Sequence, residues 1–159
     1  EIYIPFIVGH FESRNRKISN KNVEKVYNLF KGHTYYIQKT FNEAFADTPE
    51  GDECSIETLR TAINNLIAYN DTIFREILSN IPEKQKELLY AIAKDGEAER
   101  ITSAEFIKRH SLTSASSVQS ATNKLLEKDI ITEINKVYSV SEKLFAMWIC
   151  NMYSNKYTF

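Results

Sequence analysis

The chain has 159 residues, of which 43% are hydrophobic and 26% charged, a composition typical of folded globular proteins. Lys and Arg number 20 and Asp and Glu 21, and the resulting net charge of −1 argues against a strongly basic nucleic-acid binder and a polybasic membrane anchor. No apolar run approaches membrane-span length. Cys54 and Cys150 are isolated, as expected for reduced thiols of a cytoplasmic protein. The chain starts at Glu1 without Met, and we expect a cut inside a longer protein.

The first part of the chain has the pattern of several short helices. A basic loop at 14–17 follows the first of them, and Ser19 can cap the second, whose apolar stripe can end at Gly32. A third helix is predicted from about Thr34. Three apolar residues suggest that the first of these is a short apolar helix: Phe6, Ile7 and Phe11.

A longer helical pattern follows the loop at 48–53. Ser55 opens it, and apolar residues continue at helical spacing to Leu78. The polar pair Asn70-Asp71 interrupts the pattern and marks a candidate break. Residues 1–80 are therefore predicted to form one helical subdomain.

Residues 81–159 are predicted to form a second domain. Pro82 is favoured in a helix's first turn, where the N–H that it lacks would be unpaired anyway, and this helix is predicted to run to Gly96. The domain ends in an aromatic tail with Tyr157 and Phe159, which either packs down or frays. The predicted closing helix carries five apolar residues at core spacing: Leu144, Phe145, Trp148, Ile149 and Met152.

Two short helices are predicted between these outer helices. Thr102 and Glu105 form a capping-box pattern at the start of the first, in which hydroxyl and carboxylate satisfy exposed N–H groups reciprocally. A turn at 111–113 leads to Ser114, which can cap the second. One stripe of the second helix is predicted to be buried: Val118, Ala121, Thr122, Leu125 and Leu126.

A two-stranded hairpin is predicted to follow. Segments 130–134 and 137–140 flank Asn135-Lys136 at hairpin spacing. Helix, turn, helix and hairpin together make a winged helix, a fold that often reads DNA but also serves as a protein-docking module. The predicted fold class is therefore mainly α, a helical subdomain followed by a winged helix-turn-helix with a small β-hairpin.

The sequence contains no recognisable catalytic or metal-binding motif. It lacks a Gly-x-x-x-x-Gly-Lys-Ser/Thr phosphate loop, His-Glu-x-x-His, Cys-x-x-Cys and Gly-x-Ser-x-Gly. His10, His33 and His110 fall in different predicted elements, and we expect surface or helix-end histidines rather than metal ligands. The chain by itself is predicted not to be an enzyme, with no catalytic residue, metal or cofactor of its own.

One short segment, Gly32 to Gln38, supports a more specific hypothesis. On composition alone it is a helix C-cap followed by a new helix with aromatic packing. It also resembles the Gly-His-Pro-Tyr-Tyr-Ile-Gln motif in the lid domain of prokaryotic AAA+/STAND-type ATPases, often called archaeal-type ATPases. Residues 88–94, 114–119 and 145–148 are similar to the first, recognition and closing helices of that group's C-terminal winged helix. The resemblance extends from about residue 6 to residue 148 and rests on the order and spacing of these motifs.

The resemblance implies a C-terminal regulatory fragment of a P-loop ATPase. Residues 1–80 would be its lid subdomain and residues 81–159 its winged helix, without the catalytic core. The fragment would act as a protein-docking and switch module. Its implied partners are its own upstream ATPase core, another protein or DNA, and no membrane. ATP or ADP is implied for the parent protein.

The resemblance also implies which residues lie near nucleotide. In these ATPases the start of the lid helix packs near adenine and ribose, and the matching positions are Gly32, His33, Thr34 and Tyr35. A helix N-terminus favours anions through its free N–H groups and dipole. Thr34 stands where a proline is usual; proline would fix the backbone, whereas threonine can cap the helix. We expect little or no ATP binding without an upstream phosphate loop.

The alternative function is DNA binding. The second helix of the motif would then enter the major groove, where Gln and Asn can pair with adenine and Lys can reach a phosphate. The residues predicted to face DNA are Ser116, Gln119, Ser120, Asn123, Lys124 and Lys136, with Lys108 and Arg109 adding backbone contacts. Residues 81–140 hold nine Lys/Arg and nine Asp/Glu. Because DNA affinity depends largely on phosphate electrostatics, this neutral charge favours protein docking over DNA.

Overall fold

The computed structural model describes residues 3–153, which fall into two compact units. The boundary between the units lies between Tyr69 and Asn70. The division at Tyr69 and Asn70 makes the helix Asp71–Ser79 (α5) part of the second unit, whereas the sequence led us to expect a boundary at residue 80. The predicted aromatic tail with Tyr157 and Phe159 lies outside the described residues.

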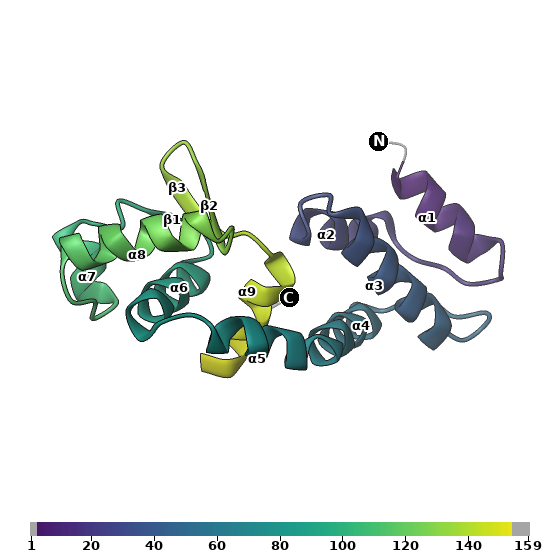
Figure 1. Cartoon of the computed structure of the whole chain (residues 1–159). Helices are drawn as coiled ribbons and strands as arrows, with labels where there is room; N and C mark the ends of the chain where they lie inside the picture. The colour runs from purple at the N-terminus through teal and green to yellow at the C-terminus, as the bar shows by residue number, and fades with distance from the viewer. Residues whose placement is uncertain (1–2, 154–159) are drawn as a thin grey trace. The chain divides into compact units, whose positions relative to one another are not determined.

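Helices make up the described part of the first unit, as predicted. Their bounds are α1 Tyr3–Glu12, α2 Asn20–Leu29, α3 Thr34–Asp47 and α4 Ile56–Tyr69 (Figure 1). The predicted cap at Ser19 is confirmed, because its Oγ accepts a hydrogen bond from the Asn22 N–H at 3.3 Å. Ser55, predicted to open the next helical pattern, has an Oγ that accepts from the Thr58 N–H at 3.0 Å. Each bond satisfies an N–H that has no partner within the helix.

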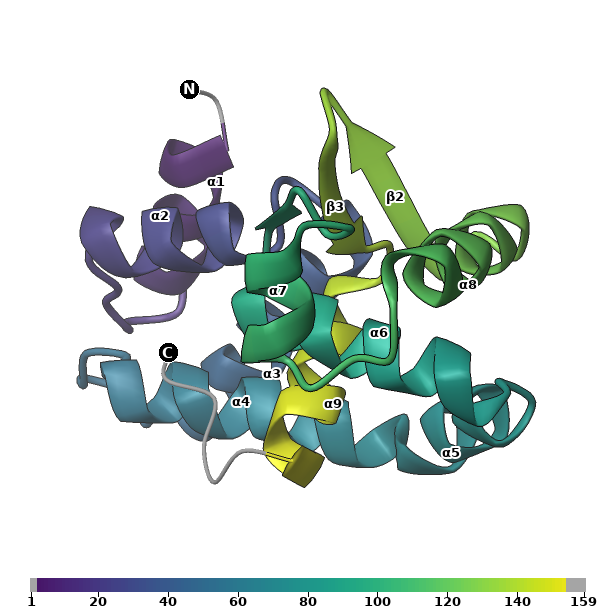
Figure 2. The same cartoon turned by 90° about the vertical axis from the view of Figure 1, so that its left-hand side faces the viewer.

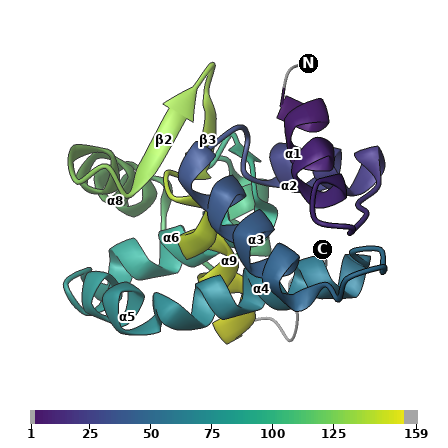
Figure 3. The ribbon, with the colours of Figure 1, turned by 90° about the vertical axis from the view of Figure 1, so that its right-hand side faces the viewer.

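The core of the first unit lies between its helices, and α3 packs along α4 (Figure 3). Buried residues of α1 and α2 add to it. The predicted first helix is present as α1, in which Ile7 and Phe11 are buried and Phe6 is 68% exposed. The largest fully buried side chains of this unit are Phe11, Phe30, Ile37 and Leu59. Each contributes roughly 1.5–3 kcal/mol through removal of its apolar surface from water.

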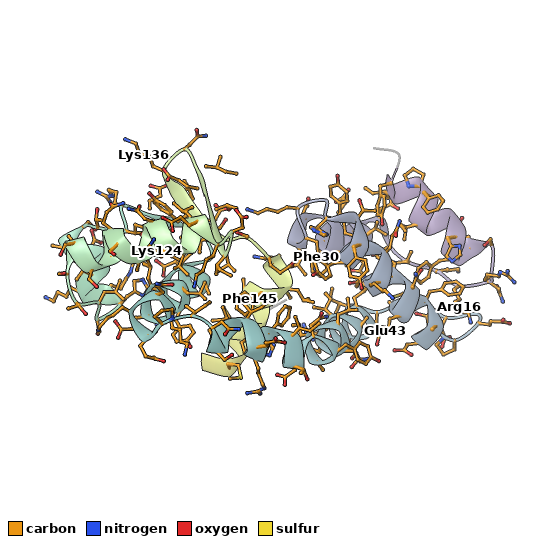
Figure 4. The ribbon with its side chains drawn as sticks, in the orientation of Figure 1. Arg16, Phe30, Glu43, Lys124, Lys136 and Phe145 are labelled. Atoms are coloured by element: carbon orange, nitrogen blue, oxygen red, sulfur yellow. The ribbon has the colours of Figure 1, made fainter. Side chains whose placement is uncertain are left out.

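Polar contacts join the ends of this unit's elements. The Arg16 Nε donates to the Thr48 carbonyl oxygen at 2.5 Å, and its guanidinium lies 4.5 Å from the centre of the Phe45 ring. The Asn65 side-chain amide of α4 donates to the Glu43 Oε1 of α3 at 2.5 Å (Figure 4). The predicted basic loop is therefore partly used to hold the end of α3.

The second unit has the element order expected of a winged helix. After α5 come α6 Glu83–Asp95, β1 Ala98–Glu99, α7 Ala104–Arg109, α8 Ala115–Glu127, β2 Ile131–Ile134, β3 Val137–Val140 and α9 Lys143–Tyr153. Pro82 occupies the N-cap position of α6, and Gly96 ends the helix with a φ of +75°, which glycine adopts without steric cost. The predicted break in the long helical pattern is confirmed, since α4 ends at Tyr69 and α5 begins at Asp71.

The caps of the two central helices match the sequence pattern with one correction. Ser103, not Thr102, is the N-cap of α7, and its Oγ accepts from the Phe106 N–H at 3.2 Å. Ser114 caps α8 as predicted, accepting from the Ser117 N–H at 3.2 Å. The capping-box spacing placed the cap one residue too early because two hydroxyl residues stand side by side.

The hairpin is confirmed, and the structure adds a third strand to it. The strand order is β1-β3-β2, with antiparallel pairing throughout. Asn135 and Lys136 form the turn with φ values of 52° and 65°, as a two-residue hairpin turn of type I′ requires. Sequence reasoning missed β1, because two residues are too few to show an alternating pattern.

Helix α6 is the centre of the second unit and packs on α8, α9 and β3 (Figure 2). Its Leu88, Leu89 and Ile92 are fully buried. The predicted stripe of α8 is confirmed for Val118, Ala121, Thr122 and Leu125, which are buried, whereas Leu126 is half-buried. In α9, Leu144, Phe145, Trp148 and Ile149 are buried as predicted, but Met152 is exposed.

A polar contact ties the start of α5 to α9. The Trp148 Nε1 donates to the Asp71 Oδ1 at 2.8 Å, and the Arg75 Nε lies 2.7 Å from the Asp71 Oδ2. The Arg75 guanidinium also lies 5.8 Å from the Trp148 ring centre. The hydrogen bond from Arg75, followed by that from Trp148, holds the pKa of the Asp71 carboxyl below its usual range.

Because the folded state lowers the pKa of Asp71, ionised Asp71 stabilises the protein. This contribution is complete above the ordinary Asp pKa of about 4 and is lost as the pH falls toward the folded-state value. We expect Asp71→Ala to lower the free energy of unfolding at pH 7 and to differ less from wild type near pH 3. Urea unfolding followed by the fluorescence of Trp148, the sole tryptophan, measures this. Glu76→Gln, an exposed acid on the same helix, is the control. If the free energies of unfolding of Asp71→Ala and wild type differ by the same amount at pH 7 and pH 3, ionised Asp71 does not stabilise the protein.

Candidate functional site

The turn between α2 and α3 contains the four residues predicted to lie near nucleotide. Lys31 and Gly32 have φ values of 48° and 79°, and the Gly32 N–H donates to the Tyr27 carbonyl at 3.1 Å. His33 is the N-cap of α3, and its side chain makes no capping bond. Thr34 is the first residue of the helix, so it does not take the capping role that we expected.

Aromatic side chains surround this turn. Tyr35 is 56% exposed, and the Lys39 Nζ lies 5.9 Å from its ring centre. The Tyr36 ring packs between His33, at 4.9 Å, and Phe30, at 5.6 Å between ring centres. The start of α3 therefore presents an exposed tyrosine beside backbone N–H groups that lack intrahelical partners.

The exposed face of α8 holds the polar residues that sequence analysis assigned to DNA. Ser116, Gln119, Ser120, Asn123 and Lys124 are all exposed on this one helix. Several are already paired within it: the Gln119 Nε2 donates to the Asn123 Oδ1 at 3.1 Å, and the Lys124 Nζ lies 2.8 Å from the Glu127 Oε2. The face is polar, and its lysine is balanced by a neighbouring carboxylate.

The hairpin forms the wing, with Lys136 at its tip (Figure 4). Glu133 of β2 stands opposite Tyr138 of β3. Burial raises the pKa of the Tyr138 hydroxyl, and the Glu133 carboxylate raises it further. Ile134 is 70% exposed on β2. The wing thus combines one cation, one carboxylate and one exposed apolar side chain.

The cations of α7 are only partly available to an external anion. Lys108 is exposed, but the Arg109 guanidinium lies 2.5 Å from the Asp95 Oδ2. His110 lies at a helix end, one of the two expected positions, as the C-cap of α7; its side chain is only 5% exposed, with its Nε2 3.2 Å from the same Asp95 oxygen. Its ring also packs 4.5 Å from the Phe106 ring. Sequence reasoning missed this network because Asp95 and His110 belong to different elements.

The other two histidines also pack against rings, His10 on Phe45 and His33 on Tyr36. Within the described residues, no three His, Cys, Asp or Glu side chains gather in a group that could hold a metal ion. In the same part of the chain, no helix is long and apolar enough to cross a lipid bilayer.

Comparison with known proteins places the second unit in a family. The family described as a probable winged helix domain matches residues 72–151. The chain belongs to this family. The matched range of the winged-helix domain begins at the second residue of α5 and ends within α9, in agreement with the second compact unit.

Structural similarity extends beyond the winged-helix domain into the first unit. A Walker-type ATPase of Pyrococcus abyssi resembles the chain with a TM-score of 0.66 and 13% sequence identity. The similarity covers 92% of this chain and 40% of that one, so the chain spans less than half the length of the ATPase. At this identity the likeness shows the fold alone. No curated protein sequence matches the chain significantly.

The positive φ of Gly32 in the α2–α3 turn can be tested by substitution. We expect Gly32→Ala to destabilise the protein by about 1 kcal/mol, because alanine is strained at positive φ. An added Cβ would also lie 3.2 Å from the Tyr27 hydroxyl. Gly9→Ala within α1 is the matched control, since its Cβ would meet no atom within 4 Å. It should be stabilising by roughly 0.5–1 kcal/mol, as alanine is the better helix former. Equal effects of both changes in urea unfolding would contradict the strained-turn interpretation.

Proposed function

We propose that the chain is the C-terminal lid and winged-helix module of a P-loop ATPase of the AAA+/STAND type. The observation that carries this proposal is the fold similarity to a Walker-type ATPase, which spans both units in one chain and covers 92% of it. The sequence contains no phosphate loop, so the catalytic core of the parent protein lies in another segment. The module itself carries out no chemistry and responds to the nucleotide state of that core.

The α2–α3 turn is the part of the module proposed to sense nucleotide. Gly32, His33, Thr34 and Tyr35 precede or begin a 14-residue helix, whose N-terminus favours an anion. The exposed Tyr35 ring offers a flat surface on which a base can stack. In place of the usual proline at Thr34, the positive φ of Gly32 and the bond from its N–H to Tyr27 fix the turn.

The face of α8 and the wing form the part proposed to dock on protein. Several of their polar side chains are paired, Gln119 with Asn123 among them, and the Lys124 charge is balanced by Glu127. A surface of this kind gains little from phosphate contacts, because DNA affinity depends on cations that release counterions. The exposed Ile134 at the wing adds apolar area that a protein partner can bury. The partner is the ATPase core of the parent or a further protein.

DNA binding is the second candidate function. The observation in its favour is the row of five exposed polar residues on α8, the recognition helix of a winged helix. Gln119 and Asn123 have the side chains that pair with adenine, and Lys136 at the wing tip could reach a phosphate. To bind a base, Gln119 and Asn123 would first have to give up or share the hydrogen bond between their side chains.

The first experiment uses the parent protein that contains this chain. We expect its upstream sequence to encode a phosphate loop and the purified protein to hydrolyse ATP. Tyr35→Ala should weaken binding of a fluorescent ADP about tenfold, the effect of losing one base–aromatic stack. Tyr69→Ala, an exposed tyrosine on α4, should leave ADP binding unchanged. An upstream sequence without a phosphate loop would overturn the ATPase assignment, whereas equal binding by both variants would remove only the nucleotide-sensing role of the turn.

The second experiment is a gel shift with the 159-residue chain and mixed-sequence duplex DNA. Protein docking predicts no shift at moderate salt, near 150 mM, and only a weak one at low salt. A shift that persists at moderate salt and is lost in a Gln119→Ala, Asn123→Ala, Lys124→Ala triple variant would establish DNA binding instead. Lys25→Ala, an exposed lysine on α2, is the control for loss of one positive charge.

A further inference from the structure

The winged-helix domain contains a cavity that the proposed functions do not use. Its volume is about 410 Å³, and it lies between α6, the end of α7 and α9. The side chains that matter for its chemistry are Tyr90, Lys94, Arg109, His110, Ile149 and Cys150. A volume above about 300 Å³ is typical of sites that hold small organic molecules.

The charges around this cavity leave one cation without a counterion. Glu87 also lines it, but both of its carboxylate oxygens lie near the Lys84 Nζ, at 3.0 and 3.1 Å. Arg109 is paired with Asp95. Lys94 has no ion-pair partner among the residues that the structure describes, so the lining carries one uncompensated positive charge.

The rest of the lining is only partly apolar. Ala91 and Ile149 are buried, and the Cys150 Sγ lies 3.2 Å from the Ala93 carbonyl oxygen, to which it donates. Burial raises the pKa of the Cys150 thiol, which is therefore neutral at pH 7 and adds no charge. The Tyr90 ring contributes an aromatic wall. A partly apolar lining that includes an aromatic side chain and one exposed lysine, unpaired within the described residues, matches a ligand with a flat apolar body and a single negative charge.

We propose that this cavity binds a small aromatic carboxylate, with its carboxylate paired to Lys94 and its ring against Tyr90 and Ile149. A monoanion fits better than a dianion, because a second negative charge would have to displace Asp95 from Arg109 and His110. A neutral aromatic molecule would leave Lys94 unpaired and gain only from the apolar wall. The site lies in the winged-helix domain but uses neither the α2–α3 turn nor the α8 face, so its test is separate from that of the proposed function.

The test is a titration of the 159-residue chain with benzoate, followed by amide shifts in ¹H–¹⁵N spectra. We expect saturable shifts confined to residues 90–94, 109–111 and 149–150. Lys94→Ala should weaken binding about tenfold, as expected for the loss of one charge-assisted hydrogen bond, and Lys94→Arg should retain it. Lys108→Ala is the matched control, since this exposed lysine lies beside the cavity residues but does not line the cavity. The same spectra report whether each variant is folded. If Lys94→Ala is unfolded, Lys94→Gln is used in its place.

Benzamide, the neutral analogue of benzoate, separates charge recognition from simple apolar binding. We expect it to bind at least tenfold more weakly, because it cannot form the ion pair with Lys94. The proposal is overturned if benzoate gives no saturable shifts up to about ten millimolar. Binding would then be weaker than a free energy of about −3 kcal/mol. The proposal is also overturned if benzamide binds as tightly as benzoate, or if removal of the Lys94 charge has no effect.

Discussion

Burial of α6 on several sides is the constraint on which the winged-helix domain depends. Because α8, α9 and β3 all pack on this helix, its apolar residues cannot be confined to one stripe. Leu88, Leu89 and Ile92 are fully buried, and even Ala91 and Ala93 lose nearly all their exposure. The polar residues of α6 are therefore restricted to its ends and one narrow edge. Both the Asp95 network and the cavity beside Lys94 lie along that edge.

The winged-helix fold is compatible with binding either DNA or protein. In this domain the pairing of surface charges distinguishes the two partners better than the fold does. On α8 the lysine that could reach a phosphate has a carboxylate one turn away, and on α7 the arginine is held by Asp95. Surface pairs of this kind add little stability, typically less than 1 kcal/mol. Their larger effect is on binding, since an external anion has to compete with a carboxylate that is already in place. This competition favours a protein surface over DNA as the partner of the α8 face.

Sequence reasoning predicted much of the fold because local rules govern the features concerned. Serine caps, a glycine at a helix end and a two-residue hairpin turn all depend on residues within a few positions of each other. Even here the errors have local causes: adjacent hydroxyls moved the cap to Ser103, and apolar spacing gave no sign that Met152 is exposed. The two-residue strand β1 is defined by its partner β3 and not by its own sequence.

The interactions that could not be predicted are those between residues far apart in the sequence. Asp71 and Trp148 lie at the two ends of the winged-helix domain, and their hydrogen bond explains why α5 belongs with that domain. On pattern alone α5 continues the helix before it, because its apolar residues keep the same spacing across Asn70-Asp71. The pattern does not show that α5 finds its partners in α9, where Asp71 bonds to Trp148 and Phe74 packs on Phe145. The Asp71–Trp148 hydrogen bond and the packing of the buried Phe74 on Phe145 and Trp148 together join α5 to α9, and these contacts between residues distant in sequence place α5 in the second unit.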